Sequence, residues 1–199
     1  YFREYPDLPR FFIARYFYMV AVNTSSAFAV LYGIKSIGFT EREVELVMLI
    51  GILVAIPGAL AWGILVDKFG PNRILKLNLL SWILVLSGAV SIPSLNLNPQ
   101  LWWGLSAFVG LCYGGLWTAD RPLLIHLSPR NLGGMFGIYG AVSRLAFLTG
   151  TMLWPTIAIV LGLGQSIALA TLVGCLMIGL GIVGTIGNSS PIGSDNERR

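Results

Sequence analysis

"GILVDKFGPNR", residues 63–73, places an aspartate, a lysine and an arginine within seven residues of an otherwise apolar chain. Hydrophobic residues make up 55% of the 199 residues and charged residues only 11%, which is typical of a membrane protein. A soluble domain of this length would need a more polar surface than 13 basic and 9 acidic residues can cover. The charges are therefore expected at the membrane boundaries or inside a bundle, and this stretch is expected to connect two spanning helices.

Apolar segments long enough to cross a bilayer, about 20 residues each, recur six times along the chain. The expected helices cover residues 10–35, 43–66, 74–93, 101–127, 134–160 and 165–187. Thr40 and Glu43 have the spacing of a capping box, and Pro71 and Pro93 stand at breaks between segments. No alternating strand pattern is found, so the fold class is all-α, a polytopic membrane helix bundle within residues 1–187.

The distribution of lysine and arginine over the loops predicts the orientation in the membrane. With the amino terminus on the first side, that side carries Arg3, Arg10, Lys68, Arg73, Lys76, Arg130, Arg198 and Arg199. The other side carries only Lys35 and Arg42. The first side is therefore expected to be cytoplasmic, with both termini and the tail 188–199 in the cytoplasm. The membrane is expected to be the cell (inner) membrane, or the vacuolar membrane in a eukaryote.

The same composition argues against several classes of function. The net charge is +4, but the basic residues are scattered singly between apolar segments, which indicates membrane orientation and not nucleic-acid binding. Cys112 and Cys175 lie in apolar runs without metal-ligand spacing, so neither a metal nor a cofactor is expected. An intramembrane enzyme would need paired acids, a Ser/His pair or a metal cluster at one depth. His126, the single histidine, is expected to be solvated at a helix end, so no catalytic residue is assigned.

Asp67 is the informative residue of the opening stretch, because it interrupts the positive trend of its side of the membrane. Gly63 and Gly70 allow the helix end to pack closely and the chain to reverse. An acid at this place needs a positive partner, either a basic side chain or the amino-terminal end of another helix. The fifth expected helix offers such an end at residues 131–133.

These residues carry a resemblance to a known family, the major facilitator superfamily. Its G-x-L-x-D-(R/K)-x-G signature, found between the second and third helix of each six-helix half, is reproduced by Gly63, Leu65, Asp67, Lys68 and Gly70. The resemblance implies that Asp67 acts as a conformational latch that docks on a helix end in one access state. Pro71 and Asn72 replace the basic pair that usually follows, and Arg73 is displaced. This looser copy is typical of a carboxyl-terminal half.

Two further stretches resemble the vacuolar amino-acid efflux branch of that superfamily. "RFFIARYFYMVAVNT", residues 10–24, is similar to the opening helix of the second half, and "LSPRNLGGMFGIYGAVSR", residues 127–144, to a later helix connection. That branch commonly has an acidic residue near Val20, which this chain lacks. The resemblance implies amino acids as the leading substrate class, with coupling through that position not expected.

Charged residues also occur inside two expected helices. Asp120 and Arg121 stand about two turns, and Arg144 about three turns, from the cytoplasmic ends of the fourth and fifth helices, roughly 10–15 Å deep. Because an isolated charge in hydrocarbon costs several kcal/mol, Asp120 and Arg144 are expected to face the interior and to pair. Such a pair either holds two helices together or handles solute or protons, and the sequence leaves both open. Arg15 is expected to snorkel to the membrane surface.

Polar residues 23–26 lie near the middle of the first expected helix, where members of the superfamily line the substrate path. Asn23 and Thr24 are assigned to the substrate path, and the two serines that follow to hydrogen bonds between helices. Tyr113 and Trp117 are candidates to stack on a substrate, with packing or an interfacial belt as the alternative.

The resemblance implies one six-helix half of a transporter, built as two inverted three-helix repeats in which the first to third helices mirror the fourth to sixth. The substrate site of this architecture lies between two halves. A second half, in the same polypeptide or a second subunit, is therefore an expected partner, together with the lipid bilayer, a small solute and protons. The expected activity is secondary transport by alternating access. The alternative is a non-transporting assembly or receptor module whose helices form a static interface.

Overall fold

A computed structural model describes residues 5–128 and 132–187, and it is helical with no strand in these ranges. The helices are α1 (Asp7–Tyr32), α2 (Glu41–Phe69), α3 (Pro71–Ser94), α4 (Leu101–Leu127), α5 (Leu132–Pro155) and α6 (Gln165–Thr185). One wider π-helical turn follows α1 (Gly33–Ile37) and another follows α5 (Thr156–Val160). The expected cytoplasmic tail and the expected loop cations Arg3, Arg130, Arg198 and Arg199 lie outside the described residues.

The helix ends follow from local chemistry and agree with the expected ranges to within a few residues. The backbone N–H of Thr40 donates to Oε2 of Glu43 (2.8 Å), which completes the capping box that begins α2. Gly70 has a φ of 84°, a conformation that favours glycine, and it ends α2 directly before Pro71 begins α3. The opening stretch is therefore a tight reversal between two long helices.

Five helices of the described chain are long and apolar enough to cross a membrane. They are α1 with its π-helical turn, α2, α3, α5 with its π-helical turn, and α6. α4 has a similar length, but glycines, tryptophans and the Asp120–Arg121 pair dilute its apolar residues. These five helices are candidate membrane spans by length and composition, which is consistent with the expected membrane helix bundle.

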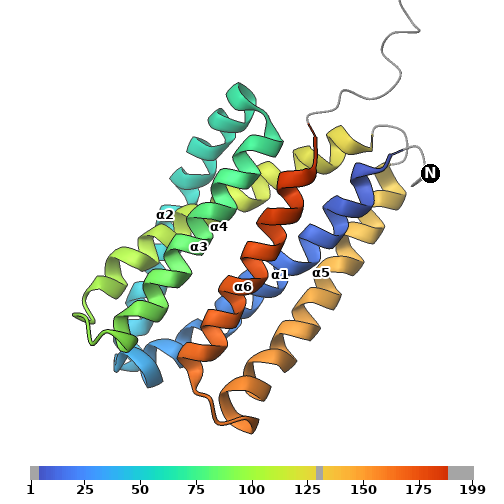
Figure 1. The fold of residues 1–199 in the computed structure, drawn as a ribbon. Coiled ribbons are helices and arrows are strands. Elements are labelled where there is room, and N and C mark those ends of the chain that lie inside the picture. The colour runs from blue at the N-terminus through green and yellow to red at the C-terminus, as the bar shows by residue number, and fades with distance from the viewer. Residues whose placement is uncertain (1–4, 129–131, 188–199) are drawn as a thin grey trace, which may run out of the picture.

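The helices pack as two groups joined along one line. α1 packs mainly against α5 and α6, α4 packs mainly against α2 and α3, and α3 and α6 contact each other (Figure 1). The start of α1, the reversal between α2 and α3, and the end of α6 lie at one end of the bundle, here called the amino-terminal end (Figure 1). The turns that connect α1 to α2, α3 to α4, and α5 to α6 lie at the opposite end.

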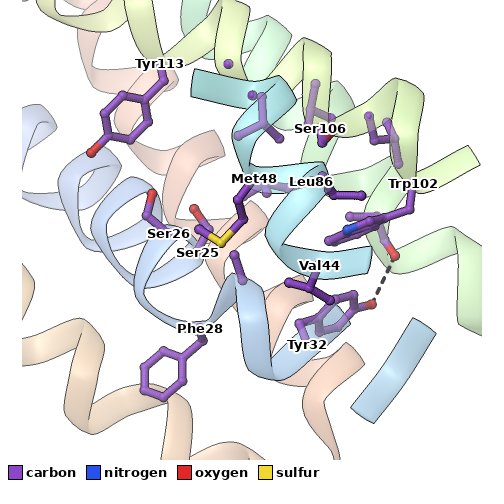
Figure 2. Close-up of a pocket in the computed structure, with 18 of the residues that line it drawn as sticks. Ser25, Ser26, Phe28, Tyr32, Val44, Met48, Leu86, Trp102, Ser106 and Tyr113 are labelled. Carbon is purple, nitrogen blue, oxygen red and sulfur yellow. Dashed lines mark hydrogen bonds between the residues drawn. The ribbon is translucent and has the colours of Figure 1, made fainter. Parts of the chain in front are cut away.

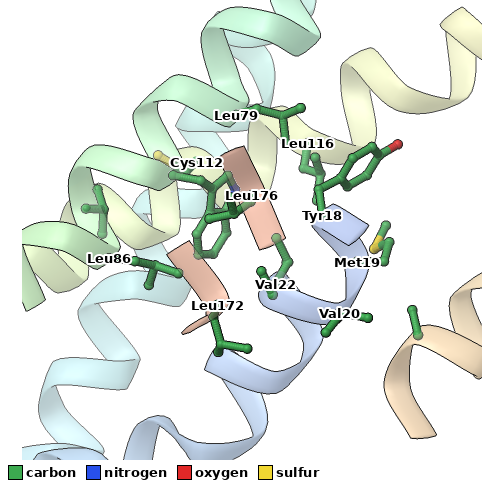
Figure 3. Packing of buried hydrophobic residues seen from close by; sticks show 14 of the residues in the cluster. Tyr18, Met19, Val20, Val22, Leu79, Leu86, Cys112, Leu116, Leu172 and Leu176 are labelled. Carbon is green, nitrogen blue, oxygen red and sulfur yellow. The ribbon is translucent and has the colours of Figure 1, made fainter. Parts of the chain in front are cut away.

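The core lies along the line where the two groups meet. Tyr18 and Met19 of α1, Leu79 of α3, Leu116 of α4 and Leu176 of α6 are all fully buried there (Figure 3). The outside of the bundle is apolar as well, with large exposed side chains along α2 and α5. Examples are Ile56, Leu60, Leu148 and Met152. An apolar exterior around a packed interior fits a protein surrounded by lipid.

Candidate functional site

A buried ion pair joins α1 to α4. Arg15 and Asp120 are both fully buried, and Nη1 of Arg15 forms a salt bridge with Oδ2 of Asp120. Tyr18 donates its hydroxyl to Oδ1 of Asp120 (2.7 Å), and Tyr139 of α5 donates to Oδ2 (2.9 Å). The carboxylate therefore interacts with one cation and two hydroxyl donors. A buried charge needs such partners to offset the loss of its hydration.

The guanidinium of Arg15 has further partners on α5. It lies over the ring of Tyr139, 3.3 Å from the ring centroid, and Nη2 donates to Oγ of Ser143 (2.8 Å). We call Arg15, Tyr18, Asp120, Tyr139 and Ser143 the buried charge cluster. It ties α1, α4 and α5 together near the amino-terminal end of the bundle.

Two expectations about these charges are wrong. Arg15 does not snorkel but is fully buried, and Asp120 pairs with Arg15 and not with Arg144. Tyr139 and Ser143 are four residues apart on the face of α5 that meets α1. Arg144 follows Ser143 and therefore points about 100° away around the helix; its side chain is exposed. The depth of Asp120 in the membrane allowed several partners on α5. The orientation of α5 about its own axis places Tyr139, and not Arg144, beside the Asp120 carboxylate.

The remaining charged groups of α4 lie outside this cluster. Arg121 is exposed, and its guanidinium carbon lies 5.3 Å from the ring centroid of Trp117, a cation–π arrangement. His126 is exposed in the last turn of α4. Across residues 5–128 and 132–187, no group of three His, Cys, Asp or Glu side chains is placed to hold a metal ion.

A cavity of about 270 Å³ lies towards the other end of the bundle, among the second halves of α1 and α3 and the first halves of α2 and α4 (Figure 2). Its aromatic lining residues are Phe28, Tyr32, Trp82, Trp102, Tyr113 and Trp154. Its hydroxyl-bearing lining residues besides the tyrosines are Ser25, Ser26 and Ser106. Met48 of α2 reaches towards the two serines of α1 (Figure 2). No charged side chain of the described residues lines this cavity.

The structure separates the residues expected on the substrate path. Tyr113 lines the cavity, whereas Asn23, Thr24 and Trp117 do not. Thr24 is fully buried where α1 meets Gly150 of α5, and Trp117 lies under Arg121. Thr24 is thus placed at a helix contact and Trp117 beside a neighbouring cation, while Asn23 is half-buried outside the cavity lining.

The serines that follow Thr24 form hydrogen bonds within α1 and not, as expected, between helices. Ser25 and Ser26 each donate a hydroxyl to the carbonyl of Val22 within α1 (3.0 and 2.9 Å), and both line the cavity. Trp82, Trp102 and Trp154 line it too, and sequence reasoning missed them. Nothing in the sequence distinguishes these tryptophans from tryptophans at the membrane interface. The inward face of an apolar helix is set by the helices packed around it.

Asp67, the proposed latch, lies exposed in the last turn of α2. It makes no hydrogen bond or ion pair with any other described residue. Asn131 is outside the described residues, but α5 begins on the far side of the bundle from the end of α2 (Figure 1). In this structure Asp67 therefore does not contact the described part of α5, and its docking in another access state stays a prediction. Lys68 and Arg73 flank the reversal and are exposed like Asp67.

Comparison with known proteins gives two findings. A family model described as Major Facilitator Superfamily matches residues 11–196. An uncharacterized MFS-type transporter of Bacillus subtilis (strain 168), YxiO, is 25% identical over 182 residues, which cover 91% of this chain and 41% of that protein. The chain thus spans about two fifths of the length of this relative. No solved structure matches the chain significantly.

Proposed function

Because the chain belongs to the major facilitator superfamily, we propose that it is one six-helix half of a secondary transporter that works by alternating access. Membership of this family makes the chain part of a transporter and not an enzyme. It is an integral, multi-pass membrane protein whose partners are a lipid bilayer and small-molecule solutes.

The pattern of helix packing supports two three-helix repeats. α1 packs against α5 and α6, and α4 packs correspondingly against α2 and α3. If α1, α2 and α3 are exchanged with α4, α5 and α6, the contacts of α1 with α5 and α6 become the contacts of α4 with α2 and α3. The contact between α3 and α6 is unchanged by this exchange. A pair of inverted repeats related by a two-fold axis has this property. This exchange symmetry is the observation that carries the proposal.

A second half completes the proposed machine. The chain covers 41% of its MFS-type relative, which leaves room for another half in a protein of that length. Transporters of this architecture bind solute between their repeat units near the middle of the membrane. We propose that a second six-helix half, in the same polypeptide or in another subunit, packs beside this one and supplies the docking site for Asp67.

The resemblance to the vacuolar branch implies amino acids and coupled protons for this chain. A zwitterionic solute needs charged or strongly polar partners, and the described lining of the cavity has no charged side chain. The buried carboxylate of Asp120 is already matched by Arg15 and two hydroxyls. We therefore propose that the buried charge cluster anchors helices and that the solute binds between this half and the second half.

The latch is tested by Asp67→Asn in the intact transporter, reconstituted into vesicles. We expect its rate of solute uptake to fall about fivefold, because a charge at a helix end contributes about 1 kcal/mol in only one of the two access states. The measurement is the initial uptake rate over a panel of amino acids and neutral aromatic solutes, normalised to protein in the vesicles.

Glu45→Gln is the matched control for this experiment. Glu45 is also exposed on α2, but near its other end, and it makes no hydrogen bond or ion pair with the described residues. We expect uptake by this variant to equal that of the parent. Equal uptake by parent and Asp67→Asn at matched protein level would contradict the latch.

A further inference from the structure

We propose that the transported solute is an organic anion, a carboxylate with an apolar body, and that Arg121 of α4 binds its carboxylate. This inference rests on the proposed transport function for the movement of the solute, whereas its binding is argued from α4. It replaces the amino acids that the sequence resemblance implied, because an amino acid also brings an ammonium group. Asp120, the only buried acid of the described residues, is already paired with Arg15.

One face of α4 carries a cation and two aromatic rings in line. Tyr113, Trp117 and Arg121 follow one another at intervals of four residues, so they lie above one another on the same face of the helix. Arg121 is exposed, and the two aromatic side chains are half-buried. The guanidinium carbon lies 5.3 Å from the ring centroid of Trp117, a cation–π arrangement. This face therefore presents a positive group beside a flat apolar surface.

No acidic side chain of the described residues neutralises Arg121. The two ion pairs of these residues do not include it. Asp120 precedes it in the sequence but points about 100° away around α4, and the Asp120 carboxylate is occupied by Arg15 and two tyrosine hydroxyls. One of these hydroxyls, that of Tyr139, also interacts with Arg121. The other N–H groups of the guanidinium remain for a carboxylate, whose geometry matches that planar fork.

The direction of α4 keeps this cation inside the bundle. Side chains of an α-helix lean towards its amino-terminal end, and α4 begins at the end of the bundle opposite the start of α1 (Figure 1). Arg121 leans accordingly onto Trp117, which lies about 15 Å from the end of α4 at Leu127. A cation held at this depth is costly in a membrane protein, so an anionic occupant offsets a cost that snorkelling does not relieve.

Arg144 of α5 is the opposite case. It is exposed too, but α5 begins at the amino-terminal end of the bundle, so the Arg144 side chain leans back towards that end. Gly140 and Ala141 precede it by four and three residues and leave room for it. It has neither an acidic nor an aromatic partner among the described residues. Its charge can therefore snorkel to the membrane surface without a bound anion.

The cavity continues the face of α4 away from the cation. Tyr113 lines the cavity and lies apart from its other labelled residues (Figure 2). It stands about 12 Å along α4 from Arg121. No charged side chain of the described residues lines the cavity. A solute whose carboxylate binds Arg121 thus meets the ring of Trp117 and then apolar surface, which favours an apolar body.

Binding is tested by titration calorimetry on the intact transporter in detergent, with three probes of similar size. Phenylacetate is an organic anion, phenylacetamide is its neutral counterpart, and phenethylamine is a cation at neutral pH. We expect phenylacetate to bind about tenfold more tightly than phenylacetamide, because hydrogen bonds between two charged groups are stronger than those to a neutral amide. We expect no measurable binding of phenethylamine.

Arg121→Gln tests the proposed cation, because it removes the charge and keeps a polar side chain. We expect it to bind phenylacetate about tenfold more weakly and phenylacetamide unchanged. Arg121→Lys keeps the charge but not the planar fork, and it should retain part of the preference for the anion. Arg144→Gln is the matched control, since it removes an exposed cation from α5. It should leave both affinities unchanged.

Trp117→Leu tests the apolar contact, because it removes the ring and keeps an apolar side chain. We expect it to bind both phenylacetate and phenylacetamide about fivefold more weakly. Trp103→Leu is the matched control, since Trp103 is also half-buried on α4 but packs on Phe39 and does not line the cavity. It should leave both affinities unchanged. All variants are first checked for an unchanged elution volume in size exclusion.

Several results would overturn the inference. Equal affinity for phenylacetate and phenylacetamide would show that Arg121 is already neutralised, as by an acidic side chain of the second half, and would refute an anionic solute. Absent binding of phenylacetate, or equally tight binding of phenethylamine, would refute it too. A preference for the anion that Arg144→Gln abolishes and Arg121→Gln retains would refute the assignment of Arg121. Undiminished binding by Trp117→Leu would refute the contact of the apolar body with α4.

The binding measurements need no gradient, so the two proposals fail separately. Phenylacetate also joins the solute panel of the uptake experiment in vesicles. A protein that prefers the anion through Arg121 but moves no solute would refute the proposed transport function alone. A protein that transports a solute but shows no preference for the anion would refute the anionic solute class alone.

Discussion

Arg15 and Asp120 show how a membrane helix bundle accommodates full charges. A buried pair is tolerated when the remaining hydrogen-bonding groups are also satisfied. Here Tyr18 and Tyr139 donate to the carboxylate, and Ser143 and the ring of Tyr139 contact the guanidinium, whose Nε alone has no acceptor among the described residues. Because these residues come from α1, α4 and α5, the cluster links one proposed three-helix repeat to the other.

The residue-scale prediction compares Arg15, which was expected to snorkel, with Arg144, which was expected to pair with Asp120. Arg15→Leu leaves the Asp120 carboxylate buried without a cation, and we expect it to lower the free energy of unfolding by about 3–5 kcal/mol. Arg144→Leu removes an exposed side chain and should change that free energy by less than about 0.5 kcal/mol. The measurement is denaturant-induced unfolding in detergent. A larger loss for Arg144→Leu than for Arg15→Leu would restore the pairing expected from the sequence.

At the scale of elements, α2 and α4 approach each other closely. A Cβ atom added to Gly114 would lie 2.5 Å from the carbonyl oxygen of Ala55, and one added to Gly110 would overlap the backbone at Gly51. Small residues on both helices therefore allow the two backbones to touch, which is a common basis of helix association in membranes. This contact also forms one edge of the cavity, since Gly51, Ala55 and Gly110 line it.

The element-scale prediction uses two glycines of the same helix. Gly110→Ala places a methyl group against the backbone of α2, and we expect it to lower the unfolding temperature through a destabilisation of about 1–3 kcal/mol. Gly104→Ala meets nothing within 4 Å, so its methyl group is accommodated without a clash. Thermal unfolding of both variants, followed by circular dichroism, makes the comparison. Equal unfolding temperatures would show that α2 and α4 do not approach this closely.

At the scale of the whole molecule, the arrangement of the helix ends supports the proposed orientation. α1 begins and α6 ends at the same end of the bundle, next to the reversal between α2 and α3 that carries Lys68 and Arg73 (Figure 1). The positive-inside rule predicts that this end lies in the cytoplasm. The proposed cytoplasmic location of both termini follows from it.

The orientation is tested at the two ends of α3, in a Cys112→Ala, Cys175→Ala background. Arg73→Cys and Ser94→Cys place single thiols at exposed positions near either end of this helix. A membrane-impermeant maleimide added to intact cells should label Ser94→Cys and should reach Arg73→Cys only after the membrane is opened. The reverse result would invert the orientation, and labelling of both from outside would show that α3 does not separate the two sides.

The sequence by itself determined the elements, because their signals are local. The length of each apolar run, the Thr40 and Glu43 box, and the Gly70–Pro71 break set the helix ends without reference to the rest of the chain. The loop signature around Asp67 predicted the superfamily, and the family match confirmed it. The depth of Asp120 was also readable, since it depends only on the rise per residue.

Only the tertiary structure decided which faces of the helices meet. A helix that is apolar on all sides, such as α6, has no polar stripe to reveal its inward face. The rotation of α5 therefore decided that Asp120 contacts Tyr139 and not Arg144, and the rotation of α3 and α5 brought Trp82 and Trp154 to the cavity. In a protein surrounded by lipid, the pattern of apolar residues does not distinguish the inward face of a helix from the lipid-facing one. The packing between helices determines which face is buried.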